Sequence, residues 1–504
     1  MNRYDVIVVG AGNGGLAAAA KTAREGYKTL VLEKHNLPGG CATSFRRGRF
    51  EFEPSLHELC HYCTAEELDS VENIFDELGV DVPLAKEEVM FRTISRGPDG
   101  YDVTLRCGDE AFLDDMEAAV PGCRESVTAW LKLNDELDDA MRYTDKHPIP
   151  NPVTLAAKYG SFLRAASHTS DEVMNALGIP PKAQSILNTY WGYLGVPTDE
   201  LNGLHYLQLF TAYMRGRPSM PYHRSHELSL ALVKNIQDHG GEIRYNSEVT
   251  RFLYDETGAA IGVACGSERF YAKQIISNII PHNVFNRSDS RKVPQRMKKL
   301  ANLRRIGMSV ITVYLGLDCT MEKLGVKDYS VFVQCCNDNR KQYEACKDGF
   351  GMYIVNCLNR VLPDCTPEGT CTLFFTVPVF PGQFPEKMEP QDYKKFKNET
   401  AKKYIEDYER LMGLSITPHI EEISVATPVT FARYLDTPEG TIYGYESSPV
   451  DNVVLRTAMK DMDYTMPRLH FCGGHYIRGD GYPSGYITGM MAAKAAISEL
   501  RREK

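Results

Sequence analysis

The hydrophobic positions at the start of the chain form two short continuous runs separated by a stretch of small residues. The runs span residues 5–9 (DVIVV) and 28–32 (KTLVL), and residues 16–20 between them read LAAAA. Continuous apolar runs of this length are typical of strands covered on both faces in a parallel sheet. The small residues predict a helix that packs closely on such a sheet. The pattern therefore predicts a strand, helix and strand at the start of the chain.

Two further patterns divide the rest of the chain. Residues from about 110 to 217 are mostly helical in period, with breaks at Pro148, Pro150 and Pro152 and again near Pro197. Residues from about 306 to 377 are rich in Val, Ile, Phe and Tyr, which favours strands. Residues 390–412 then predict a charged helix whose solvated face is the favoured interpretation, with membrane or partner contact as the alternative. We expect a mixed sheet with a helical cap.

A glycine-rich turn joins the first strand to the first helix. Gly10, Gly12 and Gly15 match the spacing GxGxxG, with Gly14 inside the motif. In a dinucleotide site the first glycine allows the tight turn, the second admits the pyrophosphate and the third lets the helix pack on the strand. Glu33 ends the second strand, where a carboxylate binds ribose hydroxyls and repels a 2′-phosphate. The segment therefore predicts a Rossmann-type unit within an α/β fold.

Composition and charge narrow the class of protein. The chain has 504 residues, of which 43% are hydrophobic and 24% charged, as in ordinary globular proteins. Its net charge of -9 disfavours nucleic acid as a partner. No apolar run reaches the ~18 residues that span a bilayer, and the first residues do not resemble a signal peptide. We expect a cytoplasmic protein, with peripheral membrane contact as the alternative.

The 14 cysteines do not predict a disulfide framework, because the chain is large and has no export signal. Cys60 and Cys63 have the spacing of a redox or metal pair, but no second such pair completes a set of four ligands. We predict that most of the cysteines are free thiols and that there is no metal site, with a functional role of the Cys60 and Cys63 pair as the alternative.

The segment after Glu33 resembles the second glycine motif of flavin oxidoreductases, which nicotinamide dehydrogenases lack. It reads PGGCATSF over residues 38–45 and GRFEFE over 48–53. The resemblance implies FAD as the cofactor. Two later segments agree with it: a strand residue at Val249 matches the one that gives its backbone to adenine, and residues 469–495 repeat a strand, glycine loop and helix. The predicted cofactor-binding residues are Gly10, Gly12, Gly14, Gly15, Glu33, Lys34, Gly39, Gly40, Cys41, Ala42, Val249, Gly473, Gly474, Asp480, Gly481 and Tyr482.

Over its whole length the chain resembles the family of FAD-dependent oxidoreductases that contains phytoene desaturases, carotenoid isomerases and retinol saturases. The segments 308–318, 427–428, 433–434 and 440–444 carry this resemblance beyond the glycine motifs. It implies a discontinuous FAD-binding domain of residues 1–80, 222–290 and 415–504. Residues 81–221 and 291–414 then form the substrate domain with its helical cap.

The chain departs from the family pattern before the adenine strand, where residues 220–226 read MPYHRSH in place of a proline and paired glycines. Polar side chains there predict proton transfer or binding of a polar substrate head. The candidate catalytic residues are Tyr222, His223, Arg224, His226 and Tyr482, and the alternative is that the loop is structural. This segment favours a polar-headed lipid over a pure hydrocarbon.

The predicted function is hydride transfer between FAD and a carbon–carbon bond of an elongated apolar substrate, in either direction. The substrate class is an isoprenoid, a retinoid or another lipid. No second GxGxxG stands between a strand and a helix, so the sequence predicts no separate nicotinamide domain and leaves the electron donor or acceptor unidentified. The alternatives are a flavin amine oxidase and a prenyl-binding or lipid-binding protein of the same fold without redox chemistry.

Overall fold

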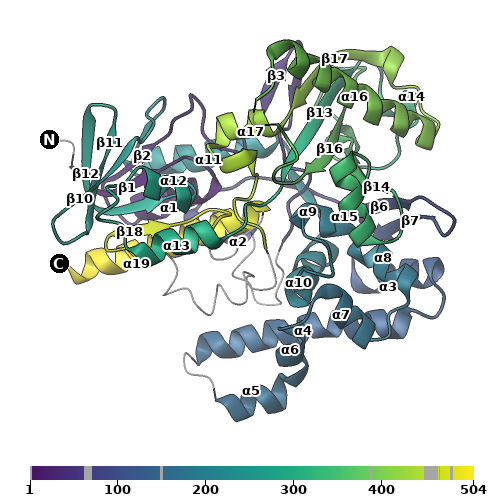
Figure 1. Cartoon of the computed structure of the whole chain (residues 1–504), viewed down its shortest axis with the longest axis horizontal. Coiled ribbons are helices and arrows are strands. Elements are labelled where there is room, and N and C mark those ends of the chain that lie inside the picture. Colours follow the sequence, from purple (N-terminus) through teal and green to yellow (C-terminus); the bar gives the residue numbers. More distant parts are fainter. Residues whose placement is uncertain are drawn as a thin grey trace.

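Two seven-stranded sheets organise the fold (Figure 1). The computed structural model describes residues 3–61, 71–147, 151–385, 387–447, 464, 466–476 and 481–503. The first sheet has the strand order β10-β11-β12-β1-β2-β9, with β18 beside β12. Its strands are β1 (Arg3–Val9), β2 (Thr29–Leu32), β9 (Glu242–Arg244), β10 (Arg251–Tyr254), β11 (Ala260–Cys265), β12 (Glu268–Ser277) and β18 (Leu469–Phe471).

Parallel pairing in the first sheet places several strand ends side by side. β1 lies between β2 and β12 and is parallel to both, and β18 is parallel to β12. In this register Val9 is opposite both Leu32 and Ser277, and Ser277 is opposite Phe471. The segments that follow these four strands therefore leave the sheet at one common edge. Ligands of open parallel sheets bind at such an edge.

The first and last helices of the chain pack closely on this sheet. They are α1 (Asn13–Arg24) and α19 (Gly481–Arg502). A Cβ atom on Gly489 would lie 2.2 Å from the carbonyl oxygen of Gly14, so the two backbones come into direct contact. Glycine is needed for that approach. The small residues predicted to pack closely thus hold the two ends of the chain together, and both termini lie on the same side of the molecule in Figure 1.

The second sheet has the strand order β17-β13-β16-β15-β14-β6-β7. Its strands are β6 (Val89–Ser95), β7 (Tyr101–Arg106), β13 (Ser309–Leu317), β14 (Ser330–Gln334), β15 (Met352–Asn356), β16 (Cys371–Val379) and β17 (Ile420–Ala426). Every residue of β13 and β16 is buried. The face with Val313 and Leu315 packs against Tyr404 and Tyr408 of α16 (Pro390–Met412). The predicted charged helix is therefore present, with one buried face.

The helical cap lies on the other side of the second sheet from α16 (Figure 1). It comprises α3 (Asp109–Ala119), α4 (Arg124–Lys146), α5 (Pro152–Lys158), α6 (Gly160–Ala165), α7 (Ser170–Ala176), α8 (Pro181–Leu187), α9 (Trp191–Leu194) and α10 (Gly203–Met214). Trp130, Trp191 and Phe210 are fully buried in its core, together with Phe332 from the sheet. The predicted mixed sheet, helical cap and α/β fold class are confirmed.

Shorter elements connect these parts. The helices are α2 (Val71–Leu78), α11 (Ser225–Asp238), α12 (Pro281–Asn286), α13 (Gln295–Leu303), α14 (Met321–Leu324), α15 (Asn339–Asp348) and α17 (Pro428–Leu435). The short strands are β3 (Phe45–Arg47) paired with β4 (Phe50–Phe52), and β5 (Leu84–Lys86) paired with β8 (Ser219–Pro221). No helix within the described ranges is both long and apolar enough to cross a membrane.

The structure differs from the expected domain division at one place. β17 pairs with β13 in antiparallel register, from Thr312 opposite Ala426 to Leu317 opposite Ile420. The second sheet therefore extends beyond residue 414, where the substrate domain was expected to end. A strand at a sheet edge is assigned by its pairing partner, which the local pattern of residues 420–426 does not reveal.

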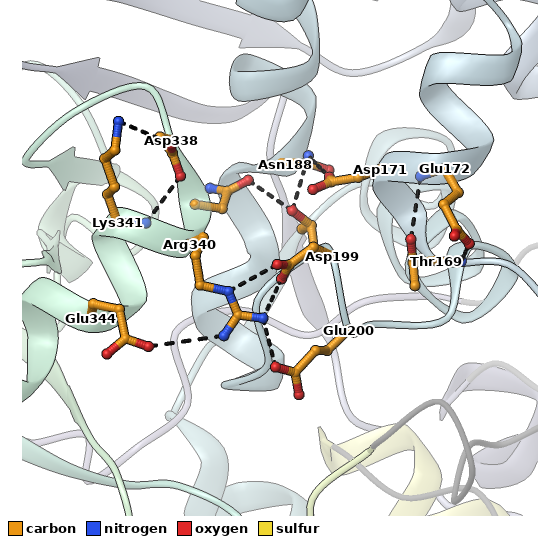
Figure 2. Close-up of polar contacts among 12 residues, drawn as sticks. Thr169, Asp171, Glu172, Asn188, Asp199, Glu200, Asp338, Arg340, Lys341 and Glu344 are labelled. Atoms are coloured by element: carbon orange, nitrogen blue, oxygen red, sulfur yellow. Dashed lines mark hydrogen bonds and ion pairs between the residues drawn. The ribbon is translucent and has the colours of Figure 1, made fainter.

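An ion-pair network joins the cap to α15 (Figure 2). The Arg340 guanidinium on α15 donates to Asp199 at 2.9 and 2.7 Å and to Glu200 at 2.6 Å, in the cap segment before α10. Next to it, Asn188 donates to Asp171 at 3.1 Å and to the Thr198 hydroxyl at 3.3 Å. The network therefore links the cap segment before α10 to α15.

Replacing Arg340 with alanine tests that contact. The Arg340 side chain is about one-third exposed, so solvent screens its ion pairs and limits their contribution to stability. We therefore expect Arg340→Ala to lower the free energy of unfolding by about 1 kcal/mol at low salt. The loss should shrink as ionic strength rises. Arg291→Ala removes an exposed pair within one loop and should have no measurable effect. Thermal unfolding at two salt concentrations measures the stability of both variants. A loss of stability in Arg340→Ala that does not depend on salt would contradict the ionic explanation.

Candidate functional site

A single large cavity runs along the common edge of the first sheet and continues under the cap. Its lining residues come from the glycine turn, the ends of β1, β2, β12 and β18, the loop after β4, α9, α10 and the start of α19. About 1650 Å³ is free of protein atoms, open solvent at the mouth included. One continuous lining thus extends from the glycine turn to the side chains under the cap.

The glycine turn forms a cradle that side chains would fill. Gly10 has a φ of +91°, which favours glycine. A Cβ atom on Gly12 would lie 2.6 Å from Nδ2 of Asn278, and one on Gly14 would lie 2.9 Å from the backbone nitrogen of Gly473. Both glycines line the cavity at the start of α1. The backbone amides of a helix N-terminus attract phosphate, so this cradle fits the pyrophosphate of a dinucleotide.

Glu33 is held in place at the end of β2. Its carboxylate accepts hydrogen bonds from the backbone N–H groups of Ala11 at 2.7 Å and His35 at 2.8 Å. Burial raises the pKa of this carboxyl above its ordinary value, while the two N–H donors act in the opposite direction. Glu33 lines the cavity beside the glycine turn. This is the position at which the carboxylate of a Rossmann unit meets a ribose.

Two asparagines complete the cradle, and the sequence analysis did not single them out. The backbone nitrogen of Asn278 donates to the carbonyl of Val9 at 2.9 Å, directly after β12. Asn13 lies at the first position of α1, and its Oδ1 is buried with no hydrogen-bond partner among the described residues. Both line the cavity. An unpaired polar atom at this point fits a ligand that supplies a donor. The signal for Asn278 was its place directly after an apolar run.

The second glycine motif lies opposite the first. The N–H of Gly39 donates to the carbonyl of Ala11 at 2.7 Å, which ties the two turns together. Gly39 and Gly40 have φ values of +118° and +60°. A Cβ atom on Gly40 would lie 3.4 Å from the Cα of Gly12. The close approach of the two turns narrows the cavity where the cofactor is expected.

The C-terminal segment closes the middle of the cavity. The N–H of Gly473 donates to the Thr488 hydroxyl at 2.9 Å on α19. The Tyr482 hydroxyl donates to the carbonyl of Cys41 at 2.8 Å and lies 3.3 Å from the Ser55 hydroxyl. Burial raises the pKa of the Cys41 thiol to about 11, so it is neutral at pH 7. This junction forms the wall of the cavity between the glycine cradle and the part under the cap.

An ion-pair cluster lies at the other end of the cradle. Val249 lines the cavity there with Glu248 and Arg287. Arg287 donates to Glu248 at 3.0 Å and to Asp436 at 2.8 Å. Lys34 also lines the cavity, and its Nζ donates to the Arg433 carbonyl at 2.9 Å.

Aromatic side chains and two ionisable groups form the end of the cavity under the cap. The His57 ring stacks between Tyr193 and Phe374, with centroid distances of 5.4 and 5.5 Å. Its Nε2 is 2.7 Å from the Thr376 hydroxyl. Glu58 accepts a hydrogen bond from the Tyr193 hydroxyl at 2.8 Å. Leu209 and Tyr213 of α10 also line this end, so two residues of the segment 205–214 face the cavity while most of that helix is core.

Burial keeps both ionisable groups neutral near pH 7. It lowers the pKa of the His57 imidazole to about 3 and raises the pKa of the Glu58 carboxyl to about 8. Charged forms are disfavoured because the surrounding side chains are apolar or phenolic. The end of the cavity under the cap is therefore uncharged and suits an apolar substrate.

Most of the predicted cofactor-binding residues line this cavity. They are Gly10, Gly12, Gly14, Glu33, Lys34, Gly39, Gly40, Cys41, Val249, Gly473, Gly474, Gly481 and Tyr482. Gly15 and Ala42 lie behind the lining: a Cβ atom on Gly15 would come within 2.0 Å of the Gly10 carbonyl oxygen, and the Ala42 carbonyl accepts from Ser229 at 3.0 Å. Asp480 lies outside the described residues.

The structure does not bring the predicted catalytic loop to the cavity. Arg224 is buried, bonds the carbonyl of Cys365 and lies 3.6 Å from Glu51. Tyr222 is 51% exposed, and His223 is also exposed. His226 is half-buried on the first turn of α11, where burial lowers its pKa. None of the four is among the lining residues.

The loop of residues 222–226 lies away from the cavity because of the contacts that hold the start of α11. Glu53 accepts from the backbone N–H of Ser225 at 3.0 Å and from its hydroxyl at 2.8 Å, and this fixes the loop against the first domain. The geometry therefore favours the structural interpretation of residues 222–226. Tyr482 is the one candidate catalytic residue that faces the cavity.

The structure describes most of the thiols but only one residue of the candidate metal pair. The cysteines in the described part of the chain are free, as predicted. Cys60 is buried and lines the cavity, whereas Cys63 lies outside the described residues.

Comparison with known proteins places the chain among dinucleotide-binding oxidoreductases. A sequence profile described as an NAD(P)-binding Rossmann-like domain matches residues 8–78. The chain is 27% identical to the all-trans-retinol 13,14-reductase of Danio rerio, over 98% of this chain and 86% of that protein. It is 21% identical to the chloroplastic prolycopene isomerase of Arabidopsis thaliana, over 99% and 84%. A putrescine oxidase structure shares the fold with a TM-score of 0.64 and 16% identity, over 99% of both chains.

The first sheet, the second sheet and the cap together have the fold of the putrescine oxidase structure. Over nearly its full length, the chain is similar to a retinol reductase and to a carotenoid isomerase. The expected resemblance to this family and the expected oxidoreductase class are confirmed.

Gly12→Val tests the dinucleotide cradle. We expect the variant to fold and to lose the bound cofactor, because the added side chain meets Asn278 and fills the space at the helix N-terminus. Gly160→Val is the matched control, since a Cβ atom there would meet only the end of Arg164 at 3.8 Å. Cofactor content of the purified variants, measured by absorbance after denaturation, decides the result. Full occupancy in Gly12→Val would contradict this assignment of the cradle.

Proposed function

We propose that this protein is an FAD-dependent oxidoreductase that transfers hydride between the flavin and a carbon–carbon bond of an elongated apolar lipid. The observation that carries the proposal is the continuity of one cavity. Its first part is the glycine cradle with Glu33, and its second part is the uncharged aromatic end under the cap. A dinucleotide and an apolar substrate thus fit end to end.

FAD fits the residues present better than a nicotinamide dinucleotide does. The motif at Gly39 and Gly40 lies against Gly12, and the family that the chain resembles is one of flavoenzymes. When bound, the flavin supplies the hydride-transferring ring. The amides of α1 and the carboxylate of Glu33 would hold the dinucleotide, and Cys41, Ser55 and Tyr482 would form the wall beside the reacting substrate.

The lining of the aromatic end supports a retinoid or another isoprenoid as the substrate. Tyr193, Leu209 and Tyr213 offer apolar surface, and His57 and Glu58 contribute polar atoms without a net charge near pH 7. The relatives are named for a retinol and for a prolycopene. The expectation of a polar head group rested on His223 and Arg224, and it loses that support because neither lines the cavity.

The amine oxidase alternative has a specific observation in its favour, namely the shared fold with putrescine oxidase. The aromatic end argues against it, because a buried ammonium ion needs an ionised partner and the pKa of Glu58 is raised to about 8. A prenyl-binding protein without redox chemistry would not need a hydride-transferring cofactor beside its ligand.

The cofactor is the first point to test. We expect the purified protein to be yellow and to release one FAD per chain, because the cradle and both glycine motifs are in place. NADPH should not bind tightly, since Glu33 repels a 2′-phosphate. Spectrophotometry after denaturation measures the FAD released per chain, and calorimetric titration measures the binding of NADPH. A colourless protein that takes up no added FAD would overturn the cofactor assignment.

The substrate class is the second point. We expect members of a panel of retinoids, carotenoids and unsaturated fatty acids to reoxidise the anaerobically reduced flavin. Stopped-flow absorbance of the flavin measures this reoxidation. In the reverse arm, the oxidised enzyme should produce no hydrogen peroxide with a panel of amines. Peroxide formed with an amine, and no reaction with any polyene, would identify an amine oxidase.

A further inference from the structure

Glu58 supplies the carboxyl group at the aromatic end of the cavity. We propose that Glu58 is the proton donor in the reduction of a carbon–carbon double bond, so that the enzyme works as a reductase. This inference rests on the proposed function and adds to it a direction and a catalytic residue. It stands on the position of the carboxyl, its hydrogen bonds and the weakness of the competing acids around it.

The hydrogen bonds of Glu58 leave one oxygen available. Oε1 accepts from the hydroxyl of Tyr193 at 2.8 Å and from that of Tyr190 at 3.4 Å. Oε2 is buried and has no hydrogen-bond partner within the described ranges of the chain. Since both phenols donate to Oε1, the proton of the neutral carboxyl resides on Oε2. Glu58 lines the cavity, so this proton is placed for a ligand and for nothing else described in the structure.

The surroundings keep that proton in place near neutral pH. The titratable groups facing Glu58 come from several elements: Tyr190 and Tyr193 around α9, Tyr213 of α10, Tyr329 before β14, Cys107 after β7 and Glu87 before β6. None of these six is a cation. The nearby guanidinium groups of Arg360 and Arg217 act to lower the pKa values of Glu87 and of Cys107, respectively. Burial raises the pKa of Glu58 to about 8.

The other proton donors at the cavity are weaker candidates. His57 is neutral because burial lowers its pKa to about 3, and its Nε2 is engaged with Thr376. The Tyr193 hydroxyl donates to Glu58, and its pKa is well above 10. Tyr482 donates to the Cys41 carbonyl. A general acid works best with a pKa near the working pH, which among these groups is the case for Glu58.

The reaction balances with a reduced flavin as the hydride donor. The π bond of the substrate breaks, and one carbon receives a hydride, with its electron pair, from the reduced flavin. The other carbon receives the proton from Oε2 of Glu58. Two C–H bonds form, the flavin is oxidised, the double bond is reduced and Glu58 is left as a carboxylate. It regains its proton from water before the next turnover.

A stability measurement tests the protonation state without cofactor turnover. Between its unfolded value of 4.5 and about 8, the folded state keeps a proton on Glu58 that the unfolded chain has lost. The stability of the parent therefore falls relative to that of Glu58→Gln as the pH rises from 5 to 8. We expect the melting temperature of the parent minus that of Glu58→Gln to decrease over this range. A difference that does not change with pH would mean that Glu58 is ionised throughout, and would overturn the proposal.

A single-turnover experiment tests the chemical role. FAD-loaded enzyme is reduced anaerobically and mixed in D2O with the most reactive polyene of the panel. In the parent the product should carry solvent deuterium at the carbon that Glu58 protonates, and a second deuterium at the other carbon where the flavin N5–H has exchanged with D2O before the hydride transfer. Glu58→Gln keeps the shape of the neutral carboxyl, and we expect it to retain FAD and substrate binding while flavin reoxidation slows ~100-fold or more.

Glu87→Gln is the matched control, because Glu87 is also buried and also has a raised pKa but does not line the cavity. It should react within a few-fold of the parent rate. If the parent reacts and Glu58→Gln reacts equally fast, Glu58 is not the donor, although the proposed function stands. If the parent binds FAD but reduces no polyene, the proposed function fails and the inference fails with it.

Discussion

The parallel pairing of β1 with β2 and β12 is the constraint on which the rest of the structure depends. Backbone hydrogen bonds continue past the strand ends, from Gly10 to Leu32 at 2.9 Å and from Asn278 to Val9 at 2.9 Å. They set the glycine turn, Glu33 and Asn278 on one edge. The carboxyl ends of parallel strands can meet only at a shared edge, and the cradle forms there because the order of the strands reverses around β1.

Close backbone packing transmits this constraint to the two ends of the chain. α19 can approach α1 because Gly489 and Gly14 carry no side chains at their contact. The C-terminal helix thereby brings Tyr482 to Cys41, which lies on the second glycine motif. Residues more than 400 positions apart thus form the junction at the middle of the cavity, and a larger residue at Gly489 would disturb the site without touching a ligand.

The two halves of the cavity differ in their electrostatics, and this difference suits them to different ligands. The cradle offers backbone N–H groups, a helix N-terminus and charged residues such as Arg287, which suit a polar dinucleotide. The half under the cap is closed by stacked rings and holds its histidine and glutamate neutral. A buried carboxyl group that is kept protonated is costly to ionise, and this state fits the proton donation that we propose for Glu58.

Local patterns in the chain predict the Rossmann unit, both glycine motifs and the cap, because apolar runs and glycine spacing reflect backbone requirements at each position. They also indicate most of the residues that line the cradle. The pairing of β17, the position of Asn278 and the lining of the aromatic end follow from the folded chain, since they depend on contacts between distant segments. The loop at residues 222–226 shows where prediction from local patterns fails. Its polar residues suggested a catalytic role, but Glu53 binds the start of α11 and Arg224 bonds the carbonyl of Cys365. No sequence pattern indicated Glu58 as a site residue, because its neutral state arises from burial among tyrosines of the cap.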